Sequence, residues 1–67
     1  MNRFEPILAY LLKPGDRYKV LKYEFAPIYV LEYFNMIGAF GHTVRPDGSI
    51  HYNTVGHFET VYKLVEV

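Results

Sequence analysis

The chain contains no cysteine and no tryptophan, and it has no excess of either charge. Without cysteine, neither a disulfide nor a thiolate metal site can stabilise it. The seven basic and seven acidic residues are spread along the chain rather than grouped. This balance argues against a protein that holds nucleic acid through a broad basic field, and equally against an acidic mimic of nucleic acid.

Long apolar runs are also missing, and none approaches the length that spans a bilayer. Glu5 and Pro6 stand where the apolar core of a secretory leader would begin. We therefore expect a cytoplasmic protein with no membrane partner.

Aromatic and apolar side chains are what the chain has in abundance. Of the 67 residues 51% are hydrophobic, with seven tyrosines and five phenylalanines. This length predicts a single domain, residues 1–67, with one small core. Each ring can bury ~150–250 Å², so we expect at least one aromatic cluster to remain exposed. Four of the tyrosines are together too many for that core: Tyr10, Tyr29, Tyr33 and Tyr62.

The clearest local signal is a β-hairpin over residues 40–53, built around Pro46, Asp47 and Gly48. Proline presets φ for the first turn position, aspartate suits the second, and glycine accepts the left-handed conformation that follows. A three-residue loop of this kind places Val44 opposite Ile50.

Alternation along the two hairpin strands separates their side chains onto two faces. The face predicted to join the core carries Phe40, His42, Val44, Ile50 and Tyr52. The other face is predicted to be wet, and with Tyr52 at its border it forms the predicted partner-binding site. The residues of that site are Thr43, Arg45, Ser49, His51, Tyr52 and Asn53. Arg45 would supply charge-assisted hydrogen bonds and His51 a pH-dependent donor.

Hydrophobic spacing predicts the remaining elements. Phe4, Ile7 and Leu11 recur at helical intervals, which predicts a short helix over about 3–12 that ends before Pro14. The expected strands are about 17–25, 28–37, 40–45, 49–53 and 61–67.

Two of these strands carry qualifications. The apolar phase shifts within 17–25, which indicates a bulge or a sharp bend. The segment 28–37 is rich in strand-forming residues, yet Pro27 and Gly38 would also suit the two ends of a helix. We favour the strand and keep the helix as an alternative.

Together these elements predict a mainly β fold: a small, strongly bent antiparallel barrel with one short N-terminal helix. In element order and turn placement it resembles SH3-like barrels. The alternative is an α+β fold with helices on one face of an antiparallel sheet. No motif assigns the chain to a family.

Neither a metal site nor a catalytic site is expected. His42 and His51 point to opposite faces of the hairpin and His57 lies beyond a loop, so the three histidines do not form a ligand set. Ser49 and His51 share a face, but no acid orients the histidine. We expect no cofactor and no enzymatic activity.

The composition favours a non-enzymatic binding module that docks on another protein or on itself. Its size is typical of accessory regulators or inhibitors encoded by phages and mobile elements. One alternative is a barrel that binds single-stranded nucleic acid through basic and aromatic side chains. The residues proposed for that role are Arg17, Lys19, Lys22 and Tyr23. A second alternative is a homo-oligomer whose tyrosines stack on a small molecule or a nucleotide.

Overall fold

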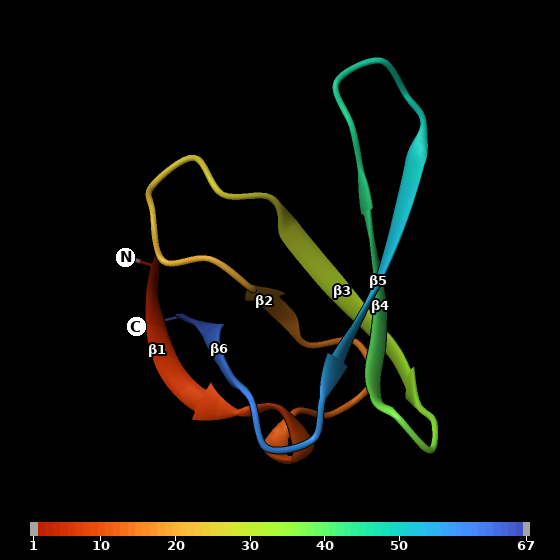
Figure 1. Cartoon of the computed structure of the whole chain (residues 1–67). Helices are drawn as coiled ribbons and strands as arrows, with labels where there is room; N and C mark the ends of the chain where they lie inside the picture. The colour runs from red at the N-terminus through yellow and green to blue at the C-terminus, as the bar shows by residue number, and fades with distance from the viewer. Residues whose placement is uncertain (1, 67) are drawn as a thin grey trace.

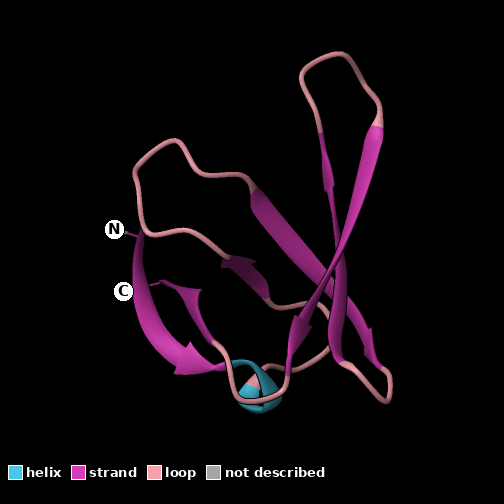
Figure 2. Ribbon diagram, in the orientation of Figure 1, coloured by secondary structure: helices cyan, strands magenta, loops and turns pink. Residues whose placement is uncertain are grey.

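The computed structural model describes residues 2–66 and is mainly β, as predicted (Figures 1 and 2). Its elements are β1 (Asn2–Leu8), the 3₁₀ turn η1 (Ala9–Leu11), β2 (Arg17–Lys19), β3 (Ile28–Phe34), β4 (Gly38–Val44), β5 (Ile50–Gly56) and β6 (Thr60–Glu66). All six strands of this described range lie in one antiparallel sheet, in the order β1-β6-β2-β3-β4-β5. No helix within it combines the length and apolar character that crossing a bilayer requires.

The helix predicted over residues 3–12 is wrong. This segment forms β1 followed by the single turn η1. Strand β6 pairs with β1 along its whole length, from Asn2 opposite Glu66 to Leu8 opposite Thr60. This partner supplies the backbone hydrogen bonds that a helix would make internally, so pairing overrides the helical spacing. Pro6 is tolerated because β1 is an edge strand.

The central strands are shorter than the sequence predicts. Strand β2 ends at Lys19, and residues 20–27 form a loop, so the change of phase marks the end of the strand and not a bulge inside it. In the ambiguous segment the structure has the strand β3 and not a helix. A shift of register between Leu31 and Tyr33 bulges β3 against β4.

The hairpin has the predicted turn and register. The Arg45 amide donates to the Ser49 carbonyl and the Gly48 amide to the Arg45 carbonyl, both at 2.8 Å. Gly48 has φ of 89°, the left-handed region that its place in the turn requires. Val44 lies opposite Ile50.

The prediction of which hairpin face joins the core is wrong. Ala39 and Val55 are buried, whereas Val44 and Ile50 are 62% and 55% exposed. The inner face is crowded by the ring of Tyr18, so β4 presents small residues there and its large side chains face outward. Figure 1 shows the outer half of the β4–β5 hairpin extending beyond the body of the molecule.

The core lies between the curved halves of the sheet and draws on nearly every element. Tyr18 of β2 is completely buried and stacks on Tyr29 of β3, with 5.9 Å between ring centroids. The buried cluster comprises Ala9, Leu12, Tyr18, Tyr29, Leu31, Ala39, Val55 and Val61.

The sheet curls but is not closed within the described residues, because its edge strands β1 and β5 do not pair with each other. Two hydrogen bonds bring the end of β1 to the turn after β5. The Ala9 amide donates to the Glu59 carbonyl and the Tyr10 amide to the His57 carbonyl, both at 2.9 Å. The closed barrel therefore stays a prediction.

Candidate functional site

A row of three aromatic side chains crosses the outer face of β3, β4 and β5. Tyr33 stacks on Phe40 with 4.9 Å between ring centroids, and Phe40 stacks on Tyr52 at 5.4 Å with nearly parallel planes. Tyr33 is the cross-strand partner of Phe40, and on the next strand Tyr52 lies two residues from Thr54, the partner of Phe40. We call Tyr33, Phe40 and Tyr52 the aromatic row.

The local backbone explains why these rings share a face. The bulge between Leu31 and Tyr33 reverses the alternation of β3 at that point, so Leu31 enters the core and Tyr33 turns outward. On β4, Ala39 and Gly41 face inward, which leaves Phe40 between them on the outer surface.

The aromatic row is accessible and continues into further apolar side chains. Tyr33 is 52% and Tyr52 53% exposed, while Phe40 between them is half-buried. Val44 and Ile50, a cross-strand pair toward the hairpin tip, extend the same face. Contiguous exposed apolar surface of this kind usually marks an interaction site.

The polar contact beside the row involves a histidine and a glutamate. The Nδ1 atom of His42 lies 3.1 Å from Glu32 Oε2, and its ring centroid is 6.3 Å from that of Tyr52. Strands β3, β4 and β5 contain no lysine or arginine. The row is therefore not flanked by cations from its own strands.

The predicted wet face of the hairpin is turned toward the body of the protein. Arg45 donates from its guanidinium to Nδ1 of His51 at 2.9 Å, and the His51 ring lies 6.2 Å from buried Tyr29. Thr43 and Asn53 on this face are half-buried. The structure thus brings Arg45 and His51 together next to Tyr29, and both residues are exposed, as predicted for a wet face.

The two other residues predicted for that site are separated from this pair. The Ser49 hydroxyl and amide both donate to Asp47 Oδ1, at 2.6 and 2.9 Å, within the turn. These bonds lower the pKa of the Asp47 carboxyl below its ordinary value. Tyr52 lies on the opposite face, as the end of the aromatic row.

The residues proposed for nucleic-acid binding lie in different environments. Lys19 is only 7% exposed, and its Nζ donates to the carbonyl of Glu24 at 2.7 Å and to that of Tyr23 at 3.4 Å. The same ammonium lies 4.3 Å from the centroid of the Phe4 ring. These contacts hold the loop of residues 20–27 against β1, so Lys19 has a structural role.

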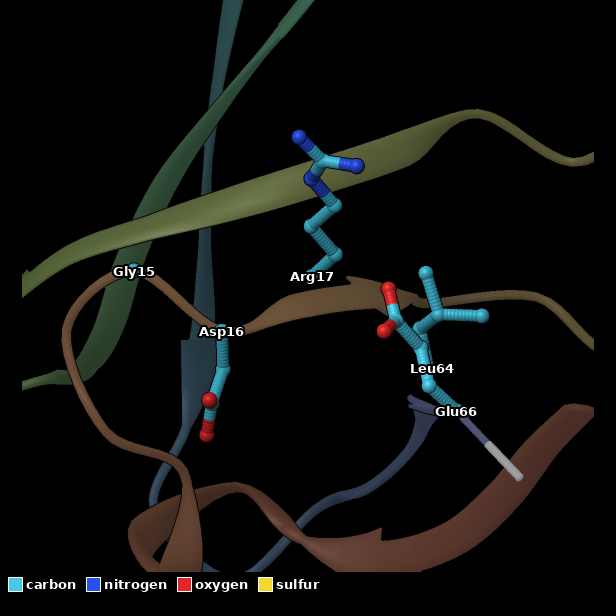
Figure 3. Close-up of a pocket in the computed structure, with 5 residues that line it drawn as sticks. All are labelled: Gly15, Asp16, Arg17, Leu64 and Glu66. Carbon is cyan, nitrogen blue, oxygen red and sulfur yellow. The ribbon is translucent and has the colours of Figure 1, made fainter. Parts of the chain in front are cut away.

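The remaining cations, Lys22 and Arg17, line two different hollows. Lys22 joins Lys19 at a hollow of about 280 Å³, lined by Phe4, Pro6, Lys19, Lys22 and Tyr62. Arg17 lies at another, of about 340 Å³, lined by Gly15, Asp16, Arg17, Leu64 and Glu66 (Figure 3). In Figure 3 the Arg17 and Asp16 side chains extend in opposite directions, and Asp16 Oδ2 lies 3.6 Å from Lys63 Nζ. Because Lys19 is buried and Arg17 shares its hollow with Glu66, the proposed cations do not form an exposed basic patch.

The third histidine also has structural contacts. The Nε2 atom of His57 lies 3.1 Å from the carbonyl oxygen of Asn35, and the His57 ring stacks on Phe34 at 6.0 Å. Across residues 2–66, no three histidine, cysteine, aspartate or glutamate side chains gather closely enough to hold a metal ion.

Comparisons with protein-family models, with curated proteins and with solved structures find no match. Sequence reasoning missed the aromatic row because it assigned Phe40 and Tyr52 to the core. The sequence did contain a signal for the inner face of β4. Ala39 and Gly41 alternate along this strand, and two such small residues leave room on their face for a large side chain from another strand.

Proposed function

We propose that this protein is a non-enzymatic binding module that acts through protein–protein contact at the outer face of β3–β5. The observation that carries this proposal is the aromatic row, whose outer members are half-exposed while their rings stack in a fixed arrangement. Tyrosine offers large contact area with few rotatable bonds, and it is enriched in the regions that dominate binding energy. Tyr33 and Tyr52 therefore replace Arg45 and His51 as the main proposed contacts.

Charge favours a protein partner over nucleic acid. Stacked rings also serve proteins that bind single strands, but those sites combine the rings with a basic groove. The strands beneath the aromatic row carry no lysine or arginine, and Glu32 adds a negative charge beside it. A nucleotide site would likewise need a cation near the phosphate.

The proposal also includes the type of fold and the biological role. The hydrogen bonds from Ala9 and Tyr10 to the β5–β6 turn support a barrel of the SH3-like kind, because they draw the two ends of the sheet together. A cytoplasmic accessory regulator, of the size that phages and mobile elements encode, is the setting we propose.

The test is a matched pair of double variants. Tyr33→Ser with Tyr52→Ser removes the outer rings of the row, and Tyr10→Ser with Phe58→Ser removes an exposed ring pair 5.7 Å apart elsewhere on the surface. Proteins retained from lysate of the native host are identified by mass spectrometry and then purified for direct titration. We expect the purified partner to bind the wild type and the control alike, and the row variant at least about tenfold more weakly.

Two results would overturn the proposal. One is equal affinity of the partner for the row variant and the control. The other is tight binding of a single-stranded oligonucleotide that weakens steeply with salt, since that dependence is the signature of phosphate contacts.

A further inference from the structure

The two edges of the sheet are built differently. The edge strand β1 contains Arg3, Glu5 and Pro6, and charges and proline are the features by which edge strands avoid pairing with other chains. The other edge, β5, has the sequence IHYNTVG, without a charged residue or a proline, and pairs with β4 without a bulge. Strand β5 is thus an unprotected edge.

The hydrogen-bonding pattern shows which backbone groups of β5 are free. In an antiparallel ladder, hydrogen-bonded pairs alternate with pairs that are not bonded. Arg45 and Ser49 form a bonded pair at the turn, so the bonded pairs further along include Thr43 with His51. The amides and carbonyls at the intervening positions point away from β4; these are Ile50, Tyr52 and Thr54.

We propose that β5 pairs antiparallel with β5 of a second copy of this chain, in a register centred on Tyr52. This inference goes beyond the proposed function, because it uses the free backbone edge of β5 and leaves the outer face of β3–β5 open. In this register Tyr52 lies opposite Tyr52 of the partner subunit, and Ile50 lies opposite Thr54 of the partner subunit. The free groups are symmetric about Tyr52, so one two-fold axis satisfies them all.

Side chains and charges both suit this arrangement. The aromatic row of one copy meets the row of the other at Tyr52, which gives one continuous outer face across both sheets. Because β5 is uncharged, no like charges oppose each other along the junction.

Light scattering after size exclusion, over a range of protein concentration, tests the pairing with the tag-free protein. We expect a dimer for the wild type and for Leu21→Lys, a control at a side chain that is 53% exposed in the loop between β2 and β3, away from β5. Tyr52→Lys places two like charges across the axis, and we expect it to weaken the dimer at least about tenfold. Ile50→Lys, also at an exposed position, serves as a second variant if Tyr52→Lys loses its circular dichroism spectrum.

Amide hydrogen exchange gives an independent backbone readout. In the proposed dimer the amides of Tyr52 and Thr54 are bonded across the junction, so their exchange should slow as protein concentration rises. A wild type that stays monomeric overturns the pairing, as does a dimer in which these amides remain fast. If such a monomer still needs Tyr33 and Tyr52 to bind another protein, the proposed function stands and the β5 pairing alone fails.

Discussion

The hydroxyl group of Tyr18 lies directly against the backbone of Gly41, in the space that any side chain at Gly41 would occupy. Tyr18 comes from β2 and Gly41 from β4, two strands that are not neighbours in the sheet. The sheet therefore curves far enough for a ring on one strand to reach the backbone of another across the core. The Tyr18 hydroxyl is completely buried and has no hydrogen-bond partner among the described residues.

Removing that hydroxyl should stabilise the protein. A buried polar group without a partner costs about 1–3 kcal/mol of desolvation, so we expect Tyr18→Phe to raise the free energy of unfolding by roughly 1 kcal/mol or more. Urea denaturation measures the change, with Tyr29→Phe as the matched control at the ring stacked on Tyr18. A loss of stability in Tyr18→Phe would show that the hydroxyl is hydrogen-bonded in solution.

Adding a methyl group at Gly41 should destabilise the protein in a way that depends on Tyr18. The new Cβ would overlap the Tyr18 hydroxyl and lie 2.8 Å from the carbonyl oxygen of Val30. Overpacking of this kind costs about 1–3 kcal/mol. In a double-mutant cycle we expect Tyr18→Phe to recover part of the Gly41→Ala loss, because the clash with Val30 remains. Strictly additive effects would mean that the two residues are not in contact.

Stability should fall at alkaline pH through Tyr18. Burial disfavours the phenolate and raises the pKa of Tyr18 to about 12 in the folded protein, against 10.0 ordinarily. Below pH 10 both states hold this proton, and as the pH rises from 10 toward 12 the unfolded state loses it first. The full difference corresponds to roughly 2–3 kcal/mol. Denaturation at stepped pH checks the loss, which should be smaller in Tyr18→Phe; identical profiles for the two proteins would contradict it.

The turn should hold the Asp47 carboxylate in its charged form. The Ser49 hydroxyl and the Ser49 amide both donate to this carboxylate, which lowers its pKa. We expect Ser49→Ala to raise the pKa of Asp47 part of the way back to its ordinary value, because the amide donor remains. An NMR titration of the Asp47 side chain measures the change. Thr54→Ala, in β5 and away from the turn, should leave this pKa where it is.

Lys19 should control the order of the loop that follows β2. Its ammonium bonds to the carbonyls of Tyr23 and Glu24, and hydrogen bonds to charged groups contribute about 1.5–3 kcal/mol. We expect Lys19→Met to speed amide exchange across residues 22–26 and to lower stability by roughly 1–2 kcal/mol. Lys22→Met, at an exposed neighbour, is the control. Unchanged exchange in Lys19→Met would show that the loop is held by other contacts.

Local chemistry predicts the hairpin turn well and the hairpin's orientation badly. Pro46, Asp47 and Gly48 carry their conformational preferences with them, so the turn and the pairing of Val44 with Ile50 are readable from the chain. Which face enters the core depends on the ring of Tyr18, which arrives from β2 and needs the space at Gly41. Within the hairpin, the small residues Ala39 and Gly41 leave room for a large side chain, but they do not specify which one fills it.

The N-terminal segment shows the same limit in another form. Phe4, Ile7 and Leu11 have helical spacing, yet β6 pairs with Asn2–Leu8 from the far end of the chain. Helical spacing of apolar residues indicates how a segment could pack one face against a core. It does not show whether a distant strand will pair with the segment and satisfy its backbone hydrogen bonds.

By itself, the sequence determined the mainly β class, the hairpin turn with its register, and the presence of more rings than the core can hold. These properties follow from propensity, turn chemistry and composition, all of which act over a few residues. Only the tertiary structure decided that the surplus rings gather at Tyr33, Phe40 and Tyr52, and that the His51 ring lies beside Tyr29. The bulge at β3 and the approach of Tyr18 to Gly41 set those positions, because both arise from contacts between segments far apart in the chain.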